Sequence, residues 1–178
     1  AGIGGTGVIT VSAVLAMAAH LQGRRASVYD MTGLAQKNGA VYSHLRLAPA
    51  EGEIHSQRIG LGQADLMLAF DLVASLGPDA YRSLREGSRV LCNSQVQATA
   101  AFQAGIAESL DPSPLMQRLT KRVGAGHVHG VDATGIAASL CGDTVGTNMF
   151  MVGVALQNGW IPLDVAAIEL AITLNAVR

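Results

Sequence analysis

The chain has few of the groups from which charged binding surfaces and metal centres are built. Charged residues make up 14% and aromatic residues 4% of its 178 residues, and the net charge is −1. With no basic or acidic block, the sequence argues against nucleic acid and anionic membranes as partners. The two cysteines, Cys92 and Cys141, lie far apart with no C-x-x-C spacing. They therefore indicate neither a disulfide framework nor a thiolate-bound metal, and the expected compartment is a reducing cytoplasm.

The sequence also offers no good candidate for a membrane span, although 49% of its residues are hydrophobic. The run from Val8 to Leu21 is interrupted by Thr10, Ser12 and His20, and it is too short to cross a bilayer. No basic region precedes it, as one would in a signal peptide. Low charge combined with many small apolar residues favours a face buried against a partner, although a compositional bias explains it nearly as well.

What the chain does contain is an alternation of strand-like and helical segments, which predicts an α/β fold. Its length suits one domain covering residues 1–178, and because a helical pattern breaks off at Arg178 we expect a fragment of a longer chain. Continuous apolar strands such as 66–70 are typical of a mostly parallel sheet covered on both faces. The sequence thus predicts a three-layer, Rossmann-like fold. The expected strands are 26–30, 41–47, 65–70, 88–93 and 127–131. Helices are expected at 7–21 and 115–123. Two more helices close the chain, the first capped by Asp143 or Thr144 and the second with Pro162 in its first turn.

One segment breaks the parallel pattern. Residues Tyr42 to Leu47 alternate between polar and apolar side chains, which is typical of a strand with one solvated or partner-facing side. A turn at Pro49 to Gly52 follows, and Glu53 to Ile59 could return as its partner strand. We therefore expect a β-hairpin inserted into the sheet.

The opening Ala1-Gly2-Ile3-Gly4-Gly5-Thr6-Gly7 is the strongest candidate for a binding site. Glycines permit a tight turn with several N–H groups facing inward, and a helix that begins at Gly7 adds the positive end of its dipole. The segment therefore predicts a cradle for a phosphate or carboxylate. Read as G-x-G-x-x-G, with Asp30 as a ribose-binding acid, it suggests a dinucleotide site, but almost no strand precedes Gly2. A tight strand-to-helix turn without ligand is an equal alternative.

A polar loop at residues 31–40 follows the second expected strand, on the side of the sheet where open α/β folds bind ligands. Gln36, Lys37 and Asn38 could bind a phosphate or carbonyl there, while a solvated turn is the simpler interpretation. Asp71 and Asp132 also follow expected strands, and we interpret both as helix N-caps.

The sequence gives little support for a metal site or for a serine hydrolase. The five histidines form no metal-binding spacing, and no serine lies in a G-x-S-x-G motif. His44 and Arg46 share a strand face, so they could meet an anionic group or pack against a neighbouring subunit.

Three ordered motifs, at residues 2–7, 30–46 and 146–149 followed by Gly153, give the chain a wider resemblance. Over nearly its whole length it resembles the gamma domain of 2-oxoacid:ferredoxin oxidoreductases, and within that family it is most similar to indolepyruvate ferredoxin oxidoreductase. This resemblance implies the fold of domain III of pyruvate:ferredoxin oxidoreductase. It also implies a part in the oxidative decarboxylation of a 2-oxoacid, such as an aryl pyruvate, with electrons passed to ferredoxin.

The resemblance further implies that the reactive groups lie elsewhere. Thiamine diphosphate and the [4Fe-4S] clusters would be bound by partner domains, since two isolated cysteines cannot hold a four-thiolate cluster. Coenzyme A as acyl acceptor and self-association of the chain are left open. No catalytic or metal-binding residue is assigned to the chain itself. The resemblance marks as cofactor-binding or interface positions Gly2, Gly4, Gly5, Thr6, Gly7, Gln36, Lys37 and Asn148.

Two other classes of function compete with this one. An NAD-dependent oxidoreductase is suggested by Gly2, Gly4, Gly7 and Asp30, but it lacks an evident hydride-transfer partner. A structural assembly module that binds nothing small is suggested by the low charge and the many small residues.

Overall fold

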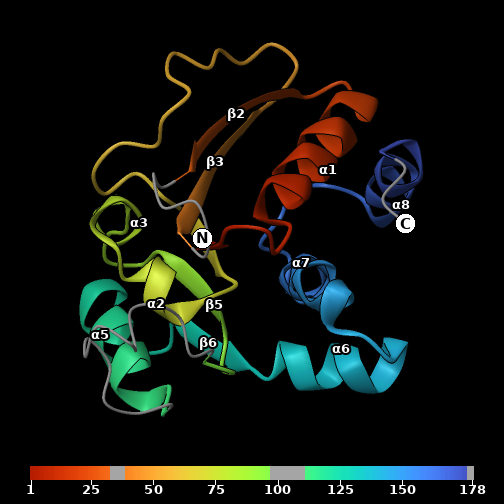
Figure 1. Cartoon of the computed structure of the whole chain (residues 1–178). Coiled ribbons are helices and arrows are strands. Elements are labelled where there is room, and N and C mark those ends of the chain that lie inside the picture. The colour runs from red at the N-terminus through yellow and green to blue at the C-terminus, as the bar shows by residue number, and fades with distance from the viewer. Residues whose placement is uncertain (33–38, 97–110, 176–178) are drawn as a thin grey trace.

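A computed structural model describes residues 1–32, 39–96 and 111–175 of the chain, which form an α/β fold with helices on two sides of a central group of strands (Figure 1). The elements in chain order are β1 (Gly2–Ile3), α1 (Val8–Leu21), β2 (Arg25–Thr32), β3 (Ala40–Ala48), β4 (Leu66–Ala69), α2 (Leu72–Ser75), α3 (Pro78–Ser83), β5 (Arg89–Asn93), α5 (Ser113–Val123), β6 (Val128–Val131), α6 (Ala133–Cys141), the 3-10 helix η1 (Thr144–Gly146), α7 (Thr147–Gln157) and α8 (Val165–Leu174).

The fold has three layers, with helices on both faces of the strands, and the side chains of β5 point alternately to the two faces. Leu91 packs into a core built largely from α1, α7 and α8, whereas its neighbours Val90 and Cys92 pack into a second core with α2, α3 and α5. Successive residues of a strand point to opposite faces, so a strand without polar positions is covered on both sides. The continuous apolar runs in the sequence therefore predicted the layering correctly.

The strands form a parallel group and an antiparallel group. β4, β5 and β6 are parallel in that order, while β3 lies between β1 and β2 and is antiparallel to both. Ala1 links the groups, because its nitrogen donates to the Leu68 carbonyl at 2.9 Å and its carbonyl accepts from the Phe70 N–H at 2.9 Å. The expected α/β class, with both parallel and hairpin strands, is confirmed.

The inserted hairpin is present, but its strands are β2 and β3. They pair from Arg25 opposite Ala48 to Thr32 opposite Val41, so the expected pairing of 42–47 with 53–59 is wrong. Residues 53–59 form no strand and are held by side chains instead: His44 Nδ1 accepts from the Ile59 N–H at 2.8 Å. The long register with β2 pairs one edge of β3 from Val41 to Ala48, which the alternation pattern within one strand could not reveal.

The helices mostly begin where the sequence predicts. α1 follows Gly7. Asp143 caps the 3-10 helix η1 by accepting from the Val145 N–H at 3.1 Å, whereas the closing helix α7 begins after it at Thr147 and has no side-chain cap of its own. Pro162 lies before α8 rather than in its first turn, so that prediction is wrong. The helix begins after Asp164, whose backbone N–H donates to the Gln22 side chain at 3.1 Å, and this contact from the end of α1 holds the start of α8 in place.

His44 makes stability depend on pH. Its side chain is buried, and burial, followed by the charge of Arg58, lowers the pKa of the imidazole. The unfolded chain therefore binds this proton more readily, so folding stability is full above the ordinary histidine pKa of about 6.5 and declines as the pH falls toward the lower folded value. Protonation also removes the acceptor for the Ile59 N–H.

We expect urea denaturation to show a lower free energy of unfolding at about pH 5.5 than at about pH 7.5. His44→Asn keeps a side-chain acceptor but does not titrate, so part of this loss should disappear in the variant. An identical pH dependence in both proteins would rule out His44 as its source.

Candidate functional site

The glycine-rich opening forms a compact turn between β1 and α1. Gly5 and Gly7 both have a φ of 85°, a left-handed conformation that other residues adopt only with strain. Within the turn, the Thr6 hydroxyl donates to the Ile3 carbonyl at 2.7 Å. Gly2 is needed for a different reason, because a Cβ there would lie 2.8 Å from Cγ2 of Val8. The sequence therefore correctly indicated a tight strand-to-helix turn.

Asn148 joins the far end of the chain to this turn. It lies in the first turn of α7, is 8% exposed, and donates from Nδ2 to the Thr6 carbonyl at 2.7 Å. The two motifs that the family resemblance marked, at residues 2–7 and 146–149, are thus in direct contact although 142 positions separate Thr6 from Asn148.

A cavity of about 520 Å³ lies beside the turn. Gly5, Thr6, Gly7 and Asn148 line it, whereas Gly2 and Gly4 are not among its lining residues. Gln36, Lys37 and Asn38 lie outside the described residues. The remaining lining residues come from β1, the start of α1, the positions at or just after the carboxyl ends of the parallel strands, and the segment from Asp143 to α7: Ile3, Thr10, Val11, Phe70, Asp71, Asn93, Thr134, Asp143, Thr144, Val145, Thr147 and Met149.

Three of these polar residues were not assigned to the site from the sequence. Asp71 follows β4, Asn93 ends β5 and Thr134 lies just beyond β6, so the carboxyl ends of parallel strands bring them together. Asn93 Nδ2 donates to the Thr134 hydroxyl at 2.8 Å. Their common position after expected strands was the signal that could have found them.

Both aspartates that we interpreted as helix caps have that role. Asp71 accepts from the Ala74 N–H at 2.7 Å, and Asp132 accepts from the Gly135 N–H at 2.9 Å. Burial raises the pKa of Asp71, although hydrogen bonds from the backbone of Ala74 and Val73 oppose that shift. A carboxylate that is already engaged in this way is a structural group of the cavity wall.

The charged side chains that line this cavity affect which ligands it can bind. Among its described lining residues, Asp71 and Asp143 carry carboxylates and none is a lysine or arginine. A bound phosphate would face these carboxylates across a partly buried space, which is unfavourable. The described walls therefore suit a neutral polar or apolar occupant better than a free anion.

The predicted dinucleotide geometry does not fit the strand order. Asp30 lies in β2, which is separated from β1 by β3, and its carboxylate accepts a hydrogen bond from the Ser43 hydroxyl. In a dinucleotide-binding fold the acidic residue stands at the end of a parallel strand close to the glycine turn. Here the strand is antiparallel to its neighbour and Asp30 already has a partner.

The base of the polar loop does lie against the glycine turn. Gly39, where the description resumes, accepts from the Gly4 N–H at 2.8 Å. Within the described ranges, no group of three histidine, cysteine or acidic side chains could hold a metal ion. The helices in those ranges also include none with the length and hydrophobicity of a membrane span.

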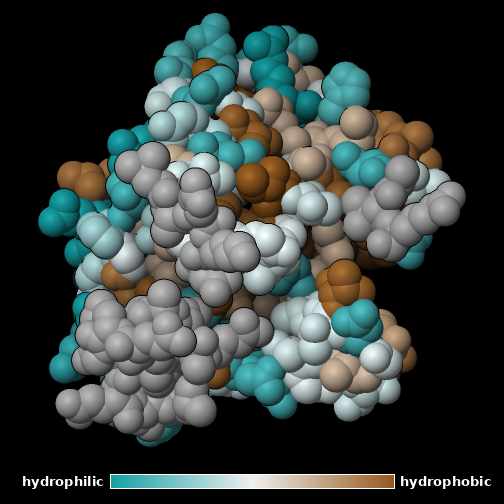
Figure 2. Space-filling model, in the orientation of Figure 1, coloured by the Kyte–Doolittle hydropathy of each residue, from teal (hydrophilic) through white to brown (hydrophobic). Residues whose placement is uncertain are grey.

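The surface near the cavity is apolar in places. Leu140 at the end of α6 and Val145 in η1 are 73% and 77% exposed. Figure 2 shows hydrophobic surface over the region of α7 and again between β3 and α1. Val145 lines the cavity, and a strongly exposed aliphatic side chain at a cavity is typical of a surface that another protein covers.

The structure is an α/β domain with a glycine turn before its first helix and a cavity at the carboxyl ends of its parallel strands, which is where open α/β folds bind their ligands. The chain belongs to the pyruvate ferredoxin/flavodoxin oxidoreductase family, whose sequence profile matches residues 1–176. The resemblance that the three motifs indicated is therefore confirmed.

Individual relatives agree with this family. Indolepyruvate oxidoreductase subunit IorB of Methanothermobacter thermautotrophicus is 32% identical over 167 residues, which cover 92% of this chain and 79% of the relative. The subunit of the same name from Thermococcus kodakarensis is 26% identical over 98% of this chain and 83% of its own length. The pyruvate oxidoreductase subunit PORC of Thermotoga maritima has the same fold, with a TM-score of 0.63 at 20% identity over 99% of this chain and 83% of that one.

Proposed function

We propose that this chain is the gamma-type subunit or domain of an oxidoreductase that oxidatively decarboxylates indolepyruvate or another aryl pyruvate and passes the electrons to ferredoxin. The substrate class rests on the relatives, four of which are named indolepyruvate oxidoreductase subunits. Thiamine diphosphate and the [4Fe-4S] clusters belong to partner subunits or domains in this proposal, and the role of this chain is assembly.

The observation that carries the proposal is the cavity beside the glycine turn. Thr6 and Asn148 tie α1 to α7 there, and Val145 presents an exposed aliphatic side chain at the same cavity. A partly apolar recess that has no lysine or arginine among its described lining residues, next to an exposed hydrophobic group, suits a protein segment that buries it. In this proposal Gly2 and Gly4 support the turn, and Gly5, Thr6, Gly7 and Asn148 form the docking edge, while the binding role of Gln36 and Lys37 stays a prediction from the sequence.

The cysteines support an indirect role. Burial raises the pKa of the Cys92 thiol to about 12, so this residue stays protonated and unreactive. Cys141 is exposed and free. A [4Fe-4S] cluster needs four ligands, usually thiolates, which supports the placement of electron transfer in partner domains.

Reconstitution tests the proposal. We expect the isolated chain to show no turnover of indolepyruvate with thiamine diphosphate and ferredoxin, and turnover to appear when the thiamine-diphosphate and iron–sulfur subunits are added. Omission of this chain from the mixture should reduce the rate at least about tenfold, the change expected when a required interface is lost. Full activity without this chain would refute the proposal.

Measurement of NAD binding by calorimetry tests the alternative that the chain is an NAD-dependent dehydrogenase. The position of Asp30 and the carboxylates of the cavity predict no measurable affinity for NAD. Micromolar binding of NAD would favour the dehydrogenase, whereas stable assembly in a complex whose activity does not depend on this chain would favour a purely structural module.

A further inference from the structure

β2 lies at one edge of the antiparallel group of strands. It pairs with β3 from Arg25 to Thr32, and among the described residues no backbone group outside β3 forms a hydrogen bond with it. Figure 1 shows β2 at the upper end of the strands, away from β5 and β6. An edge strand of 8 residues presents a row of N–H and C=O groups that can pair with a further strand.

β2 lacks the features with which proteins usually protect such an edge. Its sequence, Arg-Ala-Ser-Val-Tyr-Asp-Met-Thr, contains no proline and no lysine, and its register with β3 runs without a bulge. None of its residues is fully buried. The edge is therefore long, regular and accessible, which is the kind of edge that pairs with a strand of another chain.

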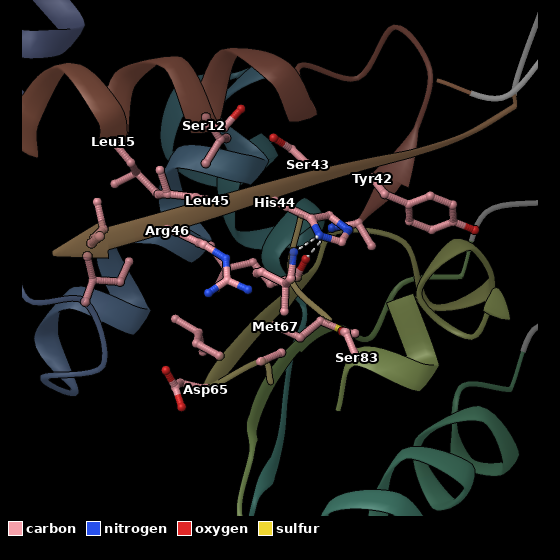
Figure 3. A pocket seen from close by; sticks show the side chains of 18 of the residues that line it. Ser12, Leu15, Tyr42, Ser43, His44, Leu45, Arg46, Asp65, Met67 and Ser83 are labelled. Atoms are coloured by element: carbon pink, nitrogen blue, oxygen red, sulfur yellow. Dashed lines mark hydrogen bonds between the residues drawn. The ribbon is translucent and has the colours of Figure 1, made fainter. Parts of the chain in front are cut away.

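The side chains of β2 alternate between the two faces of the sheet. Val28 pairs with Leu45, and Asp30 pairs with Ser43. Figure 3, a view into a cavity of about 540 Å³ that β3 and β4 line, shows Ser43 and Leu45 on the side of β3 that faces α1. Since directly opposite residues share a face, Val28 and Asp30 lie on the α1 face of β2. The even-numbered positions of the strand share this face.

A second copy of β2 can pair with this edge only in certain registers. Two identical antiparallel strands at a sheet edge are related by a two-fold axis perpendicular to the sheet, so each face of one copy continues into the same face of the other. Directly opposite residues share a face, and their numbers must therefore add up to an even number. The register centred on Ser27 meets this condition and places Arg24, which directly precedes β2, opposite Asp30 of the second copy.

Charge selects this register from its neighbours. It creates an Arg24 and Asp30 pair on each side of the axis, whereas registers centred on Ala26 or Val28 bring no opposite charges together. Within the described ranges, neither Arg24 nor Asp30 takes part in an ion pair. Both charges are thus available to a second copy, and opposite charges on facing positions of two strands stabilise their pairing.

The same axis places both copies of α1 on one face of the joined sheet. α1 packs against β2 and β3, and it contains no lysine, arginine, aspartate or glutamate. Two of its large aliphatic side chains, Ile9 and Leu21, are exposed. The approach of two such helices buries apolar surface without removing a charged side chain of α1 from water.

We propose that two copies of this chain form a dimer in which their β2 strands pair antiparallel about Ser27, so that the two antiparallel groups of strands become one sheet. Arg24 of each copy binds Asp30 of the other. Arg25 lies opposite Tyr29 of the other copy, where a guanidinium group and an aromatic ring attract each other. This inference goes beyond the proposed function and does not depend on it.

Single charge reversals test this dimer by analytical ultracentrifugation. The unchanged protein should dimerise at concentrations up to about 100 μM, as expected for an interface of modest size. Arg24→Glu and Asp30→Lys each create a like-charge pair on both sides of the axis, so each should raise the dimer dissociation constant at least about tenfold. Lys121→Glu is the matched control, because Lys121 is exposed on α5, which packs against β5 and β6, and it should leave the constant unchanged.

A mixture of the two variants tests the register itself. In a heterodimer of Arg24→Glu with Asp30→Lys, the introduced glutamate faces the introduced lysine on one side of the axis, and the native arginine faces the native aspartate on the other. The mixture should therefore dimerise about as tightly as the unchanged protein, although neither variant does so alone. Positions 24 and 30 of one chain are about 20 Å apart at a rise of about 3.3 Å per residue, so no contact within a chain can produce this recovery.

Three results would overturn the proposal. The first is a protein that stays monomeric at about 100 μM. The second is a dimer that both variants form as tightly as the unchanged chain, and the third is a mixture that does not recover. If the variants keep the dimer but no longer bind the catalytic subunits, the edge of β2 accepts a strand of another subunit, and a second copy is excluded as its occupant.

Discussion

Replacement of Val145 by glutamate is expected to weaken assembly with the catalytic subunits by at least about tenfold, which is about 1.4 kcal/mol, while the isolated chain keeps its fold. Val145 is 77% exposed and lines the cavity beside the glycine turn, so its loss removes little from the core. A carboxylate at this position would be buried in the proposed interface, at a cavity that Asp71 and Asp143 also line. An unpaired charge that loses its water there costs more than the valine contact contributes.

Leu61→Glu is the matched control for this experiment. Leu61 is 79% exposed and lies in the segment between β3 and β4, away from the lining of the glycine-turn cavity. Binding of each purified variant to the other subunits can be measured by surface plasmon resonance, with circular dichroism as a check on folding. A Val145→Glu protein that binds as tightly as the unchanged chain would remove η1 from the proposed interface, and equal weakening by Leu61→Glu would point to a nonspecific charge effect.

Leu91→Ala is expected to destabilise the fold by about 3 kcal/mol, within the usual range of about 2–5 kcal/mol for a buried leucine. Leu91 is 1% exposed in the middle of β5, where it packs into the core beneath α1 and α7. Since β5 is paired on both edges, the backbone cannot easily move to close the space that the smaller side chain leaves.

Urea denaturation measures this effect, and Leu140→Ala provides the comparison. Leu140 is 73% exposed in α6, so its truncation should change the free energy of unfolding by about 0.5 kcal/mol or less. A change below about 1 kcal/mol for Leu91→Ala would mean that the core between the sheet and α1 is not packed as described.

Much of the fold could be predicted because its signals are local. The apolar runs of β4 and β5 indicated strands covered on both faces, and Gly7 with the following helical pattern indicated the start of α1. Asp71 and Asp132 were recognisable as N-caps because each acidic residue directly precedes a helix and can bind its first free N–H groups.

The strand pairing was not predictable in the same way. The alternation in β3 shows only that one face is polar, and it carries no information on whether the partner precedes or follows it. The choice of β2 over residues 53–59 depends on the long register from Arg25 to Thr32 and on His44, which binds the Ile59 backbone with its side chain. The start of α8 likewise depended on Gln22, a residue from the opposite end of the chain.

Some features of the candidate site follow from the sequence, and others depend on the tertiary structure. The sequence by itself determined the glycine turn, since Gly5 and Gly7 take a backbone conformation that few other residues tolerate, and its motifs determined the family. Only the tertiary structure decided that Asn148 binds the Thr6 carbonyl, that Asp71, Asn93 and Thr134 meet at one cavity, and that β3 and β4 leave a cleft between them. The physical reason is distance along the chain: backbone conformation is set by a residue and its neighbours, whereas these contacts form only when packing of the whole core brings remote segments together.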